Sequence, residues 1–255
     1  MTEDPETIGA GRLLIEGGVD VARDQQYPVS GLEGNLLRLP TVGLSIGLSS
    51  IAELQIDGGL YQRLKVKTRV PAPLSNQLNF TGETTSDVED FVIATKVRLL
   101  SETGGRPAFG IRFATKLPNA SNESGLGTDT TDFYASLLAA KTVQSIRVVG
   151  NFGLGILSDP TFGSRQNDVV TYGVSFARAM TQEAEIVGEL NGRASTRSGG
   201  PLPGTENRSQ LRFGLRYTKG TVRFDGGVFF GLTSVDPTIG FTAGLTYVFN
   251  AFSVP

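Results

Sequence analysis

The 255-residue chain contains no cysteine, no histidine and no tryptophan. The absence of cysteine excludes disulfide scaffolds, thiolate metal sites and cysteine nucleophiles. The absence of histidine excludes Ser-His hydrolysis, imidazole proton transfer and histidine-ligated metals. Lys and Arg together number 23 against 25 Asp and Glu, so no basic excess indicates a nucleic-acid partner. Shape and distributed charge are left as the sources of function, and we expect no cofactor and no enzymatic activity.

Long apolar runs are also missing. No segment approaches the roughly 20 apolar residues of a transmembrane helix. Residues Met1–Gly11 do not form a signal peptide, because Glu3-Asp4-Pro5-Glu6 is acidic and no apolar stretch follows it. This beginning fits a cytoplasmic protein, and it equally fits an exported protein whose signal peptide has been removed.

The chain has instead 33 glycines and a hydrophobic period of two. Leu211, Phe213, Leu215 and Tyr217 alternate with polar or small residues, which is typical of a β-strand. Segments of this kind are longer than most strands of soluble proteins and long enough to cross a bilayer. There are twelve of them: 12–22, 34–47, 51–67, 88–100, 107–117, 130–142, 145–157, 167–180, 183–195, 207–219, 220–232 and 237–249.

The connections between these segments alternate in length. Tight turns such as Val143–Gln144 and Lys219–Gly220 alternate with longer polar loops such as Thr68–Asp87 and Pro118–Asp129. Short turns at one end, long loops at the other and an even strand count are typical of a bacterial outer-membrane barrel. We therefore predict an all-β fold: a single antiparallel transmembrane barrel of twelve strands, with short periplasmic turns and longer extracellular loops. The barrel is expected over residues 12–249, between a short N-terminal segment, 1–11, and a tail, 250–255.

One face of each predicted strand is apolar and the other carries ionisable groups. In a soluble barrel the apolar face would fill the core, whereas in an outer-membrane barrel it faces lipid and the charges line a wet lumen. Strand length and loop asymmetry favour the second interpretation. The candidate lumen-lining residues are Glu53, Asp57, Arg63, Lys96, Arg98, Arg112, Arg147, Glu185, Glu189, Arg212, Arg216, Arg223 and Asp225.

Two hypotheses account for these lumen charges. They could neutralise one another in a network that fills the bore, since unpaired buried charges are costly. They could also line a narrow channel and set its selectivity. The first hypothesis predicts close pairs such as Glu189 with Arg212. Residues 1–11 are too few for a separate plug domain, which argues against an energy-coupled receptor.

Two other motifs carry little weight. Gly43-Leu44-Ser45-Ile46-Gly47 matches the nucleophile-elbow pattern, but it lies within a predicted strand of a chain without histidine, so we expect small lumen-facing residues there. Acidic residues gather in two predicted loops, at Asp87–Asp90 and Glu123–Asp132, without the spacing of a known calcium loop. We expect them to be solvated charges or sites of lipopolysaccharide-bridging cations, and no metal site is assigned.

Several segments resemble a family of outer-membrane transporters named for the MetA-pathway of phenol degradation. The resemblance is carried by Leu39-Pro40 before a glycine-alternating strand, Lys96-Val97-Arg98-Leu99-Leu100, Thr115-Lys116-Leu117-Pro118, Gly125-Leu126-Gly127-Thr128-Asp129 and Gly244-Leu245-Thr246-Tyr247-Val248-Phe249. It implies an outer-membrane location and passage of small molecules, apolar or aromatic ones among them. The alternative is a non-conducting barrel that presents loops to other proteins. The expected partners are the bilayer, lipopolysaccharide and a small solute; oligomerisation is left open.

Overall fold

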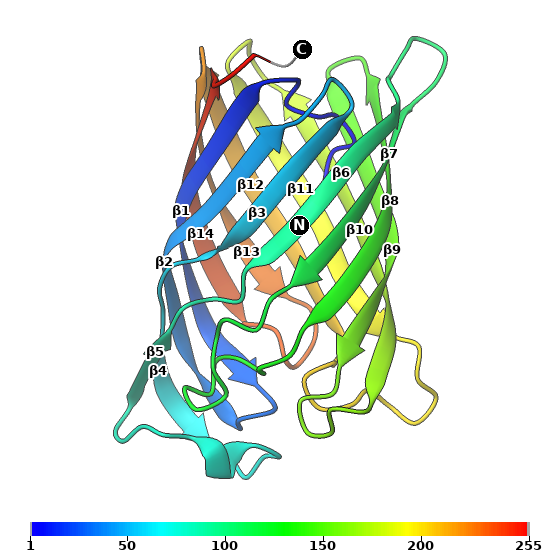
Figure 1. The fold of residues 1–255 in the computed structure, drawn as a ribbon. Coiled ribbons are helices and arrows are strands. Elements are labelled where there is room, and N and C mark those ends of the chain that lie inside the picture. Colours follow the sequence, from blue (N-terminus) through cyan, green and yellow to red (C-terminus); the bar gives the residue numbers. More distant parts are fainter. Residues whose placement is uncertain (1, 254–255) are drawn as a thin grey trace.

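Twelve antiparallel strands close into a barrel in the computed structural model, which describes residues 2–253 (Figure 1). Their order around the barrel is β1-β14-β13-β12-β11-β10-β9-β8-β7-β6-β3-β2, and pairing of β1 with β2 completes the ring. The predicted twelve-stranded antiparallel barrel is confirmed. The strands are β1 (Arg12–Tyr27), β2 (Leu32–Gly47), β3 (Ala52–Gly59), β6 (Val92–Leu100), β7 (Ala108–Lys116), β8 (Asp132–Val143), β9 (Ile146–Ser158), β10 (Gln166–Ala179), β11 (Ala184–Ser195), β12 (Arg208–Lys219), β13 (Val222–Gly231) and β14 (Ile239–Asn250).

Two further strands lie outside the ring. β4 (Gln62–Arg69) pairs with the extracellular half of β2, and β5 (Thr84–Asp87) pairs only with β4. They project beyond the barrel at the lower left of Figure 1. The segment predicted as one strand, 51–67, is therefore two strands, β3 and β4, separated at Leu60–Tyr61.

This break corrects one predicted site residue. Glu53, Asp57 and Gly59 face inward on β3, but on β4 the buried positions are Gln62, Leu64 and Val66. The two residues between the strands change the parity, because side chains alternate between the faces of a strand. Arg63 is exposed on the outer face of β4, and its assignment to the lumen was wrong. Lys65 lies on the same outer face.

The two ends of the barrel differ. The longer connections gather at the lower end in Figure 1, whereas the tight turns and the C-terminal end of the chain lie at the upper end. We name these the extracellular and periplasmic ends, following the arrangement usual in such barrels. Within residues 2–253 the helical structure is a single turn at Ser75–Gln77, and no helix there is long and apolar enough to span a membrane.

The outer wall is apolar over most strands. Leu137, Phe152, Phe213 and Leu215 are each more than half exposed, at positions that alternate with inward polar residues. Such a belt cannot face water without a large cost, and it fits the hydrocarbon of a bilayer.

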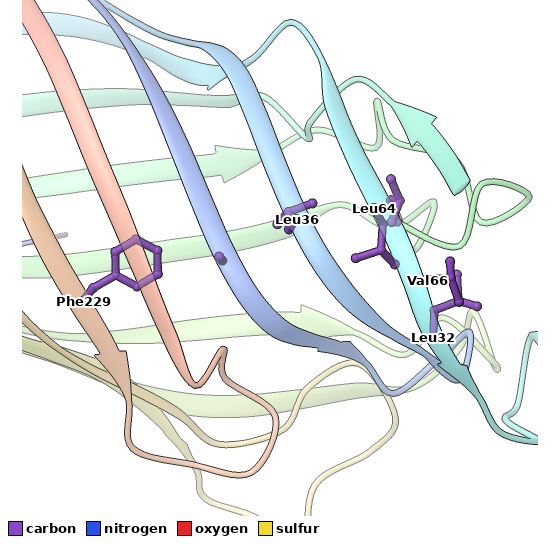
Figure 2. Close-up of a cluster of buried hydrophobic side chains, with 7 residues drawn as sticks. Leu32, Leu36, Leu64, Val66 and Phe229 are labelled. Carbon is purple, nitrogen blue, oxygen red and sulfur yellow. The ribbon is translucent and has the colours of Figure 1, made fainter. Parts of the chain in front are cut away.

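A buried apolar cluster lies inside the barrel near its extracellular end. Leu36 of β2, Leu64 of β4 and Phe229 of β13 belong to it (Figure 2), together with Leu126 from the loop before β8. The phenyl ring of Phe229 occupies the space above Gly240, where a Cβ atom would lie 2.1 Å from it. The interior therefore contains a buried apolar cluster at this end.

Candidate functional site

Residues 2–8 run through the interior of the barrel. The Ile8 amide donates a hydrogen bond to Glu53 Oε2 of β3 (2.8 Å), and the Thr2 amide donates to Glu189 Oε1 of β11 (2.6 Å). Between them, the Glu3 amide donates to Asn151 Oδ1 of β9 (2.5 Å). Five strands separate β3 from β11 on either side of the twelve-stranded ring. The segment therefore crosses from one wall of the bore to the opposite wall.

The acidic residues of this segment are paired with lumen cations. Glu3 Oε2 lies 3.4 Å from Lys96 Nζ, and Asp4 Oδ1 lies 2.6 Å from Arg147 Nη2. Glu6 forms an ion pair with Arg98. Each of the three carboxylates thus neutralises a different cation of β6 or β9. Ion pairs in such a partly buried setting are screened less than surface pairs.

Glycines on the inner wall make room for the segment. A Cβ atom at Gly47 would lie 1.8 Å from the Gly9 carbonyl oxygen, and one at Gly173 would lie 2.6 Å from Thr2 Oγ1. A Cβ at Gly110 would lie 3.1 Å from Pro5 Cβ. Any larger residue at Gly47 or Gly173 would displace the segment, so its path depends on these positions.

The remaining charges of this wall are paired within the wall itself. Glu53, which is 1% exposed, lies 3.0 Å from Lys96 Nζ. Arg112 Nε donates to Gln55 Oε1 (2.8 Å), and its Nη2 lies 3.5 Å from Asp57. The wall formed by β3, β6, β7 and β9 therefore holds the predicted residues Glu53, Asp57, Lys96, Arg98, Arg112 and Arg147, together with the N-terminal segment.

The opposite wall, formed by β11, β12 and β13, is different. Glu185 faces Arg216 and Glu189 faces Arg212 in the strand register, as expected from the sequence. No carboxylate among the described residues lies within 4.0 Å of either arginine, however, because Glu189 is bound to Thr2 instead. Asp225 of β13 faces Arg216 in the strand register, but its carboxylate likewise lies more than 4.0 Å from the guanidinium.

Arg212 and Arg216 are therefore the cations that the described structure leaves without an ion pair on the inner wall of β12. Arg212 Nη2 donates to Gln210 Oε1 (2.8 Å), and its guanidinium lies 5.0 Å from the centre of the Phe229 ring. Farther along this side, Arg223 is paired with Glu16 of β1 at 3.1 Å. The two guanidiniums therefore have donors that no carboxylate of the described chain accepts from.

Two loops fold together over the extracellular end. Asp87 accepts hydrogen bonds from the amide and hydroxyl of Ser121, and Asp90 accepts from the amides of Asn119 and Ala120. Lys116 bridges Asp90 and Asp132 at 3.1 and 3.2 Å. Asp87, Asp90 and Asp132 are thus engaged by protein donors, and no three carboxylates among residues 2–253 are placed to hold a metal ion.

A cavity of about 180 Å³ lies beneath these loops. It is lined by apolar groups of Tyr27, Leu126 and Tyr134 and by the charged groups of Arg193 and Arg208. The predicted entrance loops, Thr68–Asp87 and Pro118–Asp129, do meet at this end, where Asn122 Nδ2 donates to Gln77 Oε1 at 2.7 Å.

Residues of the periplasmic turns contact Arg147 from the side opposite Asp4. Glu102 accepts hydrogen bonds from the amide and hydroxyl of Thr142 and lies 3.1 Å from Arg147 Nη1. The backbone hydrogen bond from Thr142, assisted by Lys141, keeps the pKa of Glu102 below its ordinary value. Glu102 is therefore ionised at neutral pH and forms a second ion pair with Arg147, in addition to that of Asp4.

Sequence reasoning did not place the N-terminal segment in the bore. The available signal was charge: three carboxylates within four residues at Glu3, Asp4 and Glu6, beside a predicted lumen rich in arginine and lysine. The elbow-like Gly43–Gly47 does lie within β2, and Gly43 and Gly47 face the lumen. No strand-to-helix turn is present at that motif.

Comparisons with solved structures agree with this fold. The chain is similar to the COG4313 outer membrane channel from Pseudomonas putida F1, with a TM-score of 0.66 and 14% identity over 98% of this chain and 99% of that one. It is also similar to the NanC porin (TM-score 0.56, 8% identity, 92% and 98%) and to the translocator domain of the autotransporter NalP from Neisseria meningitidis (0.51, 12%, 94% and 88%).

Comparisons by sequence give no family. No family model matches the chain, and no curated protein matches it. The likeness to the MetA-pathway transporters therefore stays a prediction. At such low identities the structural matches establish the fold alone. Together with the apolar outer wall, they show a transmembrane barrel of the bacterial outer-membrane type.

Proposed function

We propose that the protein is an outer-membrane channel for passive passage of small organic molecules, aromatic acids among them. The observation that carries this proposal is the inner wall of β12 and β13. There Arg212 and Arg216 have no carboxylate partner within the described chain, and Arg212 lies against the ring of Phe229. Guanidiniums without a carboxylate partner suit a negatively charged solute, and the buried Phe229 ring lies against the Arg212 guanidinium.

The similar structures support a channel, since two of them are named as an outer membrane channel and a porin. The apolar cluster around Leu36 and Leu64, which are 2% and 0% exposed, fills part of the bore at the extracellular end. The N-terminal segment narrows the path at the other end. Passage would follow the wall that this segment does not cover.

A second candidate function is a non-conducting barrel that presents its loops to other proteins. One observation favours it: the N-terminal segment reaches both walls of the bore and is held by three ion pairs. In that case Arg212 and Arg216 would be structural, and the extracellular loops would carry the function.

Flux measurements separate the two. The full chain is reconstituted in planar bilayers and liposomes, and ionic current and uptake of 4-hydroxybenzoate and arabinose are measured. The channel predicts current and uptake of both solutes, with 4-hydroxybenzoate selectively slowed in Arg212→Gln/Arg216→Gln. Arg178→Gln, at an exposed position on the outer wall, is the control and should behave like the unmodified protein. Absence of current and of uptake would refute the channel and leave the second candidate.

A further inference from the structure

Three cations are exposed on the outside of the barrel near its extracellular end. Arg63 and Lys65 point outward from β4, because the residues between and beside them, Leu64 and Val66, are buried. Arg23 of β1 is exposed next to buried Ala22. Lys65 pairs in register with Asn35 of β2, and β2 also pairs with β1. The three cations therefore lie on adjoining strands of one outer surface.

None of the three has an ion pair within residues 2–253. The next two cations along β4 do have partners: Lys67 is bound to Asp24 at 2.6 Å, and Arg69 lies over the Phe80 ring at 4.4 Å. The carboxylate of Asp24, which follows Arg23 on β1, is already paired with Lys67. Arg23, Arg63 and Lys65 keep their full complement of donors for a partner outside the chain.

The position of Arg63 identifies the kind of partner. Arg63 pairs with Leu37, Leu37 pairs with Val21, and Val21 pairs with Phe241. Val21 and Phe241 are 44% and 53% exposed and belong to the apolar outer belt. An arginine in the same row is tolerated only at the membrane interface, where lipid phosphates can bind it.

Apolar side chains continue from the cations toward the membrane. Leu39, Leu60 and Tyr61 are each between 40% and 55% exposed, and backbone hydrogen bonds join Leu39 to Tyr61 and Leu60 to Pro40. An occupant of this surface therefore meets charge at its outer edge and hydrocarbon below it. This is the arrangement of an amphiphile with a phosphorylated head group and acyl chains.

We propose that Arg23, Arg63 and Lys65 form a binding site for the phosphate groups of lipid A, the membrane anchor of lipopolysaccharide, with its acyl chains over Leu39, Leu60 and Tyr61. The site goes beyond the proposed transport function and requires only that the barrel lies in the outer membrane. Its location at the end with the long loops matches the outer leaflet, where this lipid resides. It also explains why β4 extends past the ring with basic residues on its outer side.

The test compares lipid A with the same glycolipid after removal of its phosphates. The refolded full chain in detergent is titrated with each lipid in excess EDTA, which removes bridging divalent cations, and bound lipid is counted by native mass spectrometry. The test variant is Arg63→Gln/Lys65→Gln. The matched control, Arg178→Gln/Lys219→Gln, removes one arginine and one lysine that are exposed at the periplasmic end.

The unmodified protein and the control should retain lipid A with the same affinity, and the test variant should bind it about thirtyfold more weakly. The dephosphorylated lipid should bind all three proteins equally and weakly. Equal binding of lipid A to the test variant and the control would overturn the proposal, and so would undiminished binding of the dephosphorylated lipid. A stable dimer that excludes lipid A would overturn it in favour of a second copy. Ionic current through the same preparations is measured separately, so failure here does not bear on the channel.

Discussion

Deletion of residues 2–8 should convert the bore into a wider and more anion-selective path. The deletion removes Glu3, Asp4 and Glu6 and so leaves Arg98 without its partner. It also leaves Lys96 with Glu53 alone. Because three negative charges are lost and none is added, the net charge of the bore becomes more positive by three units.

The expected shift can be worked out from these charges. At about 8 Å from a permeating ion in water, each charge is worth roughly 0.5 kcal/mol, and screening at physiological salt reduces the sum for three charges to about 0.6 kcal/mol. A potential of this size enriches anions about 2.6-fold and depletes cations equally. The anion-to-cation permeability ratio should therefore rise about sevenfold.

Reversal potentials across planar bilayers with a KCl gradient measure this ratio, and single-channel conductance measures the width. Two variants separate charge from bulk. Glu3→Gln/Asp4→Asn/Glu6→Gln keeps the length of the segment, and Gly173→Val forces Thr2 out of its place. Gly150→Val is the control for the latter, because nothing lies within 4 Å of a Cβ atom at that outward position. An unchanged permeability ratio and conductance after deletion would refute the reasoning.

Two further predictions concern stability. Glu53→Gln breaks a buried ion pair and should lower the free energy of unfolding, measured by urea titration, by about 3 kcal/mol. Asp24→Asn breaks an exposed ion pair and should lower it by less than about 1 kcal/mol. Equal losses would contradict the difference in burial between the two pairs. Glu102 has a lowered pKa, so its contribution is complete above the ordinary glutamate pKa of about 4.3 and is lost as pH falls through the lower value in the folded protein. Glu102→Gln should therefore weaken the dependence of the urea midpoint on pH between about 5 and 3, and an unaltered dependence would exclude this group.

The barrel could be predicted from the sequence because lipid imposes a regular pattern. A strand that faces hydrocarbon on one side must alternate, and segments such as 208–219 show this without knowledge of their neighbours. Strand number and loop asymmetry follow from the same local signal. That β11 and β12 pair could be anticipated as well, since strands consecutive in sequence are usually neighbours in such a barrel, even across the long connection between Ser195 and Arg208.

The position of Arg63 could not be obtained by extending one strand through 51–67. Two consecutive apolar residues, Leu60 and Tyr61, interrupt the alternation, and that interruption was the available signal. A shift of one residue in parity moves every later side chain to the other face. The consequence is that Arg63, predicted to face the lumen, lies on the outer surface.

The pairing of the lumen charges depended on contacts that no local pattern contains. Glu189 faces Arg212 on the neighbouring strand, yet it binds Thr2, which is 187 residues away in sequence. The charges of the bore are therefore balanced between the wall and the N-terminal segment, and each carboxylate that the segment brings to β6 or β9 offsets one wall cation. Arg212 and Arg216 receive no such partner, so the proposed channel would owe its selectivity to β12 and its width to the segment that crosses the bore from β3 to β11.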